Sequence, residues 1–301
     1  MARGQMPVTT CGQTLGTAGE YLLMNDLTCA APMGDFDGVR ITASNVTFHL
    51  GGHTISSSVC DDSRNVTGIF VVGAITNVKI DGGKVSGFND GIQLSSSNSR
   101  VAGMTVTGAC VSGIGVQGDN NEVTANIVTG SGSDGILLSP ATRAAIRGNH
   151  CTGNTRAGVA LSDGAYNNLI AFNILNNNGG LGGEGYGVAI FNGIGNTVRD
   201  NAANYNNYGI RIVSAVNPGG LADPINRILD NTATNNSNLG IWVEPTLEPS
   251  NIRRNSVFNS GVADMQDDSP GCGANTWRNN RFVTDLVNGV PNGGPSVPCL
   301  R

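Results

Sequence analysis

A group of polar and aromatic residues near the C-terminal end of the chain has the composition of a site that acts on sugars. Arg211, Trp242 and Glu244 are followed by Gln266 and Asp268. An aromatic ring beside carboxylates and a guanidinium can bind a sugar and supply acid–base chemistry. Arg211, Glu244 and Asp268 are therefore candidate catalytic residues, and Trp242 and Gln266 are candidate substrate-binding residues. The same five residues also fit an exposed cluster of charges near the end of an elongated fold.

A second group of candidate substrate-binding residues consists of arginines that recur along the chain, namely Arg147, Arg199, Arg253 and Arg278. A row of guanidinium groups can hold a uronate or sulfated polysaccharide through paired hydrogen bonds. The alternative is that these charges only keep a long surface soluble.

Two further groups of residues are weaker candidates for a site. The adjacent carboxylates of Asp61 and Asp62 could hold calcium, but such a site needs about six oxygen ligands. His49, His53 and Lys84 lie in the same part of the sequence and include possible bases. No phosphate-binding loop, dinucleotide-binding motif or metal-binding cysteine pair is present, so we expect no metal and no other cofactor.

These side chains can come together only if a repeat places them in the same phase, and the chain contains such a repeat. Nine short segments begin with Gly, continue with Ile or Val, and then alternate in polarity. Their glycines are Gly38, Gly68, Gly91, Gly113, Gly135, Gly158, Gly187, Gly209 and Gly240. The basic spacing is 22–23 residues, and three units are lengthened to 29–31. A period of this length is typical of stacked solenoid units.

The alternation within each repeat predicts which side chains face the solvent. The first and third residues after the glycine should point inward, and the second and fourth should point outward. Arg211 and Trp242 then share an outward column, with Glu244 two residues beyond Trp242. The stretch "AIRGNHC" looks like part of an active site, but this phase places Cys151 in the core as an inert thiol and His150 outside.

The composition supports a fold with many tight turns. The chain has 44 Gly and 37 Asn among 301 residues, and only 13% of its residues are charged. Glycine and asparagine tolerate left-handed backbone conformations better than other residues. One turn position carries Asn at Asn126, Asn149, Asn173, Asn201, Asn231, Asn255 and Asn280. We expect these side chains to form a hydrogen-bonded ladder along the stack.

The repeated G-I/V-x-L/V and V-x-x-N-x-V patterns resemble those of the right-handed parallel β-helix repeat family, in the pectate-lyase-like superfamily. The resemblance covers roughly residues 39–282 and implies an all-β fold, a single-stranded right-handed parallel β-helix of about ten coils with capped ends. It suggests the activities of a polysaccharide lyase, a glycoside hydrolase or an epimerase. Their N-T-D, G-H-G, R-I-K, D-P-H-E, W-x-D-H and R-x-P-x-x-R motifs are missing, so the resemblance indicates the fold more than the activity.

The predicted organisation has three parts. Residues 1–36 form an N-terminal cap, residues 37–285 form the β-helix, and residues 286–301 form a tail that closes the last coil. Both terminal parts contain two cysteines, which suggests the disulfides Cys11–Cys29 and Cys272–Cys299. Such disulfides are typical of a secreted or periplasmic protein.

The sequence leaves two functional classes open. The first is a secreted carbohydrate-active enzyme, a lyase, hydrolase or epimerase that acts on an acidic polysaccharide. The second is a non-catalytic β-helix that binds glycans or builds a surface, either as a monomer or as a homotrimer. The apolar outward residues Phe70, Val72, Leu137, Phe191 and Val213 favour the second class. The net charge of −5 does not suggest a nucleic-acid partner, and no apolar run is long enough for a membrane span.

Overall fold

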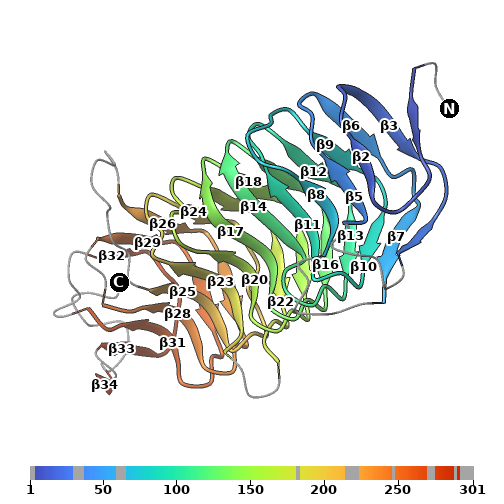
Figure 1. Cartoon of the computed structure of the whole chain (residues 1–301). Coiled ribbons are helices and arrows are strands. Elements are labelled where there is room, and N and C mark those ends of the chain that lie inside the picture. The colour runs from blue at the N-terminus through green and yellow to red at the C-terminus, as the bar shows by residue number, and fades with distance from the viewer. Residues whose placement is uncertain are drawn as a thin grey trace.

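The computed structural model is an elongated stack of coils (Figure 1), and the regular elements of its described residues are all short β-strands. It describes residues 4–29, 37–58, 66–180, 184–213, 224–245, 248–269, 275–287 and 290–291. In each complete coil the chain runs through three sheets in turn, and nearly all strand pairs are parallel. The predicted all-β parallel β-helix of about ten coils is therefore confirmed.

Sheet 1 has twelve strands. They are β1 (Met6–Val8), β3 (Gly19–Leu23), β6 (Val46–His49), β9 (Lys79–Asp81), β12 (Arg100–Ala102), β15 (Glu122–Thr124), β18 (Ala145–Arg147), β21 (Leu169–Ala171), β24 (Thr197–Arg199), β26 (Asn226–Leu229), β29 (Ser250–Arg253) and β32 (Thr276–Arg278).

Sheet 2 has seven strands, and a separate pair of strands continues its direction. The seven are β4 (Leu27–Cys29), β7 (Thr54–Ser57), β10 (Lys84–Ser86), β13 (Thr105–Thr107), β16 (Ile127–Thr129), β19 (His150–Thr152) and β22 (Ile174–Asn176). The pair is β27 (Thr232–Thr234) and β30 (Ser256–Phe258), and isolated bridges through Ala202 join it to β22.

Sheet 3 has thirteen strands and carries the Gly-led segments of the repeat. They are β2 (Gln13–Leu15), β5 (Val39–Ile41), β8 (Thr67–Val71), β11 (Asp90–Ser95), β14 (Ile114–Asp119), β17 (Asp134–Thr142), β20 (Ala157–Leu161), β23 (Tyr186–Phe191), β25 (Tyr208–Val213), β28 (Leu239–Val243), β31 (Ala263–Asp267), β33 (Asp285–Val287) and β34 (Val290–Pro291). Among the strands of the described residues, only the last pair, β33 and β34, is antiparallel.

The predicted alternation of faces is confirmed on sheet 3. Ile210 and Ile212 are fully buried, whereas Arg211 between them points outward and is partly exposed. The leading glycine of each segment lies where two coils approach closely. A Cβ atom at Gly113 would come within 2.7 Å of the carbonyl oxygen of Gly135 in the next coil. Only glycine fits there, which explains its recurrence at this phase.

Asparagine ladders run along all three corners of the coil. The ladder at corner 1, between sheets 1 and 2, is the predicted one, and its amides bond from Asn126 through to Asn280. Corner 2, between sheets 2 and 3, carries a ladder from Asn154 through Asn178 to Asn206. Corner 3, between sheets 3 and 1, carries one from Asn168 to Asn226. The first ladder was predicted from the sequence, and the other two were not.

The cysteines agree with the predictions where they are described. Cys11 and Cys29 form a disulfide, and Cys151 is a fully buried free thiol whose pKa is raised by burial. Cys110 is a further disulfide cysteine that the sequence analysis did not pair. The predicted Cys272–Cys299 bond lies outside the described residues, as does most of the predicted C-terminal tail. Strands β1–β4 of the predicted N-terminal cap pair with all three sheets.

We expect the loss of one central ladder amide to destabilise the protein strongly. Asn201 accepts hydrogen bonds from the amide nitrogens of Asn173 and donates one to Asn231. Asn201→Ala leaves buried polar groups unpaired on both sides, so the free energy of unfolding should fall by about 3 kcal/mol in a urea titration. The control Asn25→Ala changes an exposed asparagine and should stay within about 0.5 kcal/mol of the parent. Similar losses in the two variants would contradict a structural role for the ladder.

Candidate functional site

The five candidates predicted near the C-terminal end lie together on the outer face of sheet 3. Arg211 is on β25, Trp242 is on the neighbouring β28, and Glu244 directly follows that strand. Gln266 is on β31, in register with Trp242, and Asp268 follows it. The parallel register therefore brings together residues that are 57 positions apart in the sequence (268 − 211).

Arg211 is the centre of this cluster. Its Nε donates to Glu244 Oε1 over 2.6 Å, and its Nη1 donates to Glu184 Oε2 over 2.6 Å and also to the phenol of Tyr186. Its guanidinium lies 4.3 Å from the centroid of the Trp242 ring. Only 12% of the Arg211 side chain is exposed, so its contacts hold it in one orientation.

Three aromatic rings form a stack beside Arg211. The centroids of Tyr186 and Tyr208 are 5.4 Å apart, those of Tyr208 and Trp242 are 5.3 Å apart, and both pairs are inclined by 26°. Each ring therefore has at least one face against a neighbouring ring. The Arg211 guanidinium also lies over the Trp242 ring. The stack is rigid, and it leaves mainly ring edges and polar groups for contact with a ligand.

The two predicted carboxylates have different partners. Glu244 is paired with Arg211, whereas Asp268 accepts hydrogen bonds from Trp242 Nε1 at 2.8 Å and from Gln266 Nε2 at 2.9 and 2.8 Å. Asp268 thus fixes the orientation of the indole and of the amide. Because the Arg211–Glu244 and Trp242–Asp268 bonds join adjacent coils, the geometry of the cluster depends on the coil register.

Three residues of this cluster were missed by the sequence analysis, namely Glu184, Tyr186 and Tyr208. The signal was present, because Tyr186 and Tyr208 each directly precede the leading glycine of a repeat. Strict alternation of faces does not place that position outward. In the pairing of β23 with β25, Tyr186 is opposite Tyr208 and Val188 is opposite Ile210, and the glycine between them is not part of the pairing. Glu184 lies just before β23, outside the repeating pattern, so only its contact with Arg211 assigns it to the cluster.

Contacts within the cluster shift the pKa values of Glu184, Tyr186 and Arg211. The hydrogen bond from Tyr186, with a smaller contribution from Arg211, lowers the pKa of Glu184. Burial, together with the nearby Glu184 carboxylate, raises the pKa of Tyr186, so this phenol remains a proton donor at neutral pH. Burial lowers the pKa of Arg211, but its bonds to Glu244 and Glu184 outweigh this effect and the net shift is upward.

A small apolar cluster continues the outer face toward the N-terminus. Ala157, Ala160 and Ala189 are fully buried although they lie on the outer side of sheet 3. Phe191 packs against Tyr186 edge to face, with 6.0 Å between their centroids, and Arg156 lies 5.5 Å from its ring centroid. This apolar cluster supports the aromatic stack from one side.

The arginines of the second predicted group lie on sheet 1, away from the strands that carry Arg211. Arg147, Arg199 and Arg253 are in register, but Ala171 and Leu229 occupy the coils between them. Arg253 and Arg278 are direct neighbours. Arg199 also pairs with Asp200 at 2.6 Å and lies over the Phe172 ring. The row is therefore interrupted and partly neutralised.

The weaker candidates do not form one cluster. His49 bonds to Asp81 at 2.8 Å and His53 bonds to Asp26 at 3.1 Å, so each histidine has its own carboxylate partner. Asp61 and Asp62 lie outside the described residues. Among the described residues there is no group of three or more metal-ligating side chains. Across all the residues that the structure describes, no helix has the length and hydrophobicity needed to cross a membrane.

Comparison with known families places the fold. The family model described as "Right handed beta helix region" matches residues 67–219 and 112–288 of this chain. The two matches together cover more than half of the chain. The chain belongs to this right-handed β-helix family. No curated protein sequence gives a significant match.

Several solved structures share the fold of this family member. A mutant of the periplasmic alginate epimerase AlgG is 15% identical, with a TM-score of 0.64 over 93% of this chain and 77% of that one. The A-module of the Azotobacter vinelandii mannuronan C-5 epimerase AlgE4 is 15% identical, with a TM-score of 0.60 over 92% and 85%. The Dettilon tailspike protein gp208 is 14% identical, with a TM-score of 0.56 over 94% and 61%. At these identities the likeness concerns the fold.

We expect the pKa of Glu184 to lie below its ordinary value of about 4.3 and to depend on Tyr186. A lowered carboxylate pKa means that any stability from this group is complete above the unfolded value and is lost as the pH falls through the folded value. NMR titration of the glutamate carboxyl carbons should show the low midpoint, and Tyr186→Phe should move it upward. The control Tyr166→Phe should leave it unchanged. An ordinary midpoint in the unmodified protein would rule out the contact.

Proposed function

We propose that the chain is a carbohydrate-active β-helix protein that binds an acidic polysaccharide across the outer face of β23, β25, β28 and β31. The observation that carries this proposal is Arg211, which is held among three aromatic rings and two carboxylates at the surface of a rigid sheet. The fold neighbours support it, since two are epimerases of alginate or mannuronan and one is a phage tailspike. A secreted or periplasmic location agrees with the Cys11–Cys29 disulfide.

Arg211 would bind the carboxylate of a uronic acid by an exchange of ion-pair partners. Glu184 is 60% exposed and contacts Arg211 from the solvent side, whereas Glu244 is only 21% exposed. An incoming carboxylate can replace Glu184 and retain the Glu244 pair, so that the charge on Arg211 remains compensated. A planar guanidinium bound along two of its edges suits this exchange.

The same exchange suits a reaction at the carbon next to that carboxylate. Lyases and epimerases both begin by removing the proton from this carbon, and neutralising the carboxylate makes that proton more acidic. Tyr186 would supply a proton donor beside Arg211, and Glu244 and Asp268 are the candidate proton-transfer groups. Trp242 and Gln266 would contact the neighbouring part of the sugar. A hydrolase would use the same carboxylates as an acid–base pair.

A polysaccharide assay tests this proposal. Alginate, polygalacturonate, chondroitin sulfate and heparin are incubated with the protein, with and without calcium, while new unsaturated uronates, reducing ends and the NMR spectrum of the polymer are followed. Activity on at least one polymer is expected, and Arg211→Ala, Glu244→Gln and Asp268→Asn should each reduce it by at least about 100-fold.

The matched control for this assay is Arg100→Ala, which removes an ion-paired arginine from sheet 1. This variant should keep its activity. Unchanged rates in the Arg211, Glu244 and Asp268 variants would exclude this face as the active site, and no change in any polymer would exclude catalysis on the acidic polysaccharides tested.

A non-catalytic role is the second candidate, and the ion pairs of Arg211 favour it. A glutamate that is held ionised by a phenol and an arginine, as Glu184 is, acts poorly as a general acid. In this role the face would bind a glycan without altering it, as a monomer or as a homotrimer. Retention on an acidic polymer without turnover, together with the mass in solution from light scattering, distinguishes this role from the enzymatic one.

A further inference from the structure

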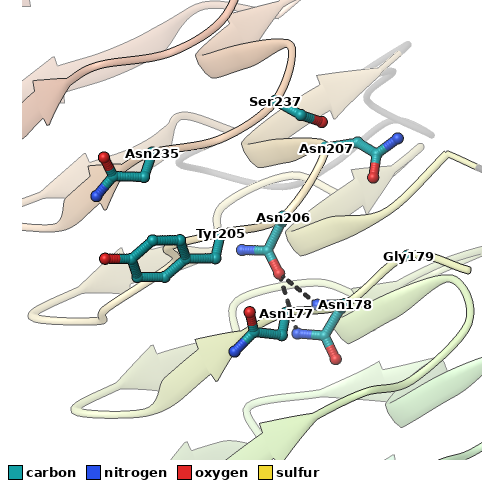
Figure 2. A pocket seen from close by; sticks show the side chains of 8 residues that line it. All are labelled: Asn177, Asn178, Gly179, Tyr205, Asn206, Asn207, Asn235 and Ser237. Atoms are coloured by element: carbon teal, nitrogen blue, oxygen red, sulfur yellow. Dashed lines mark hydrogen bonds between the residues drawn. The ribbon is translucent and has the colours of Figure 1, made fainter.

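A hollow lies at corner 2, where the chain passes from sheet 2 to sheet 3 (Figure 2). It has a volume of about 340 Å³ and spans three successive coils. Its lining consists of Asn177, Asn178, Gly179, Tyr205, Asn206, Asn207, Asn235 and Ser237. None of these eight side chains is charged, which sets this hollow apart from the Arg211 cluster.

The floor of the hollow is rigid. Asn178 and Asn206 are buried members of the corner 2 ladder, and the amide of Asn178 donates to Asn206 Oδ1 over 3.2 Å. Asn206 is in turn tied to Asn236, whose Oδ1 accepts from the Asn206 backbone nitrogen at 3.0 Å. A surface fixed in this way presents its rim without a cost for ordering it.

The rim is made by residues in the left-handed backbone conformation. Asn177, Tyr205 and Asn235 have φ angles of 55°, 58° and 56°, and each directly precedes a ladder position. In the two preceding coils this position is Gly130 and Gly153, which have no side chain. The rim therefore begins where side chains replace glycine at this position.

Tyr205 is the most informative residue of the rim. A bulky side chain is strained at positive φ, whereas glycine would adopt this conformation freely. Yet 59% of Tyr205 is exposed, so burial of its ring does not compensate the strain. The corner imposes this backbone conformation in successive coils, but it does not require a bulky residue there, so the choice of tyrosine points to a function of the ring.

The Tyr205 ring differs from the rings near Arg211 in its surroundings. Within the described residues it has no stacked ring and no cation over its face, whereas Tyr186, Tyr208 and Trp242 cover one another. Figure 2 shows the ring extending outward beside Asn206, with Asn235 on the next coil. An open aromatic face flanked by amide groups matches the apolar face and the hydroxyl groups of a sugar.

We propose that this hollow binds an uncharged sugar residue, which packs on Tyr205 and hydrogen-bonds to the side chains of Asn177 and Asn235. The hollow adjoins the Arg211 cluster along the chain, because Asn207 directly precedes Tyr208 of the aromatic stack. Asn238, the residue after Ser237, donates to the Tyr208 hydroxyl over 2.7 Å. If the proposed function of the Arg211 cluster holds, one polymer that contains both uronic acids and neutral sugars can occupy both places.

Affinity electrophoresis tests the proposal with three kinds of polymer. These are the neutral polymers galactomannan, dextran and xyloglucan, the uronate-only polymer polygalacturonate, and hyaluronan, in which a uronate alternates with an uncharged amino sugar. The unmodified protein should be retarded by hyaluronan and by at least one neutral polymer. Tyr205→Gly should weaken this binding about tenfold, which corresponds to about 1.4 kcal/mol.

The variants separate binding from folding. Tyr205→Gly removes a strained residue, so its Tm should equal or exceed that of the unmodified protein. Tyr205→Phe keeps the ring and should keep most of the affinity. Phe172→Gly is the matched control, because Phe172 is an exposed aromatic residue with φ 58° at corner 1, outside the hollow. It should bind the neutral polymers as the unmodified protein does.

Two results would overturn the proposal: no retardation by hyaluronan or any neutral polymer, or equal retardation of Tyr205→Gly and the unmodified protein. Failure of the proposed function looks different. In that case Arg211→Ala leaves binding of polygalacturonate and all turnover unchanged, while the Tyr205-dependent binding of neutral polymers remains.

Discussion

The asparagine ladders are the interaction on which the rest of the structure depends. Along corner 1, each ladder amide from Asn126 to Asn255 donates to the asparagine oxygen of the next coil, and that same oxygen accepts the backbone nitrogen of the previous ladder residue. Buried amides have no alternative partner in an apolar core, so a shift of one coil would leave many of them unpaired. The ladders thereby fix the rotational phase of every coil. They also tolerate coils of unequal length, since their steps range from 23 to 30 residues across corners 1 and 3.

Because the coils cannot rotate relative to one another, side chains at equivalent positions of successive coils form columns on the outer face. The chemistry of a column depends on which residue types lie next to one another in it. Aromatic rings one coil apart stabilise each other directly, as Tyr186 and Tyr208 do. Carboxylates one coil apart would repel, so each needs a donor of its own. Arg211 supplies this for Glu184 and Glu244, and Trp242 with Gln266 supplies it for Asp268. The charged cluster is thus internally satisfied before any ligand arrives, and a ligand must exchange with one of these partners.

The corner 2 hollow follows a different principle. Its floor belongs to a ladder and is fully bonded, but its rim residue Tyr205 is held in a strained conformation with an open ring. No exchange of partners is needed for a ligand to contact this ring. The two places on the protein are therefore suited to different chemistry, one to a charged group that replaces a glutamate and one to an uncharged surface that packs on an aromatic ring.

The sequence by itself determined the fold, because a repeat with leading glycines and period-2 alternation leaves little choice other than stacked parallel strands. The position of Arg211, Trp242, Glu244, Gln266 and Asp268 on one outer face also followed from the repeat, as did the burial of Cys151 and the ladder from Asn126 to Asn280. Only the tertiary structure decided which partners these side chains take. Glu184 lies in an insertion that breaks the period, and Tyr186 and Tyr208 occupy a position next to glycine where simple alternation fails. The strain at Tyr205 is likewise invisible in the sequence, since the backbone conformation of a residue depends on the ladder that follows it and not on its own type.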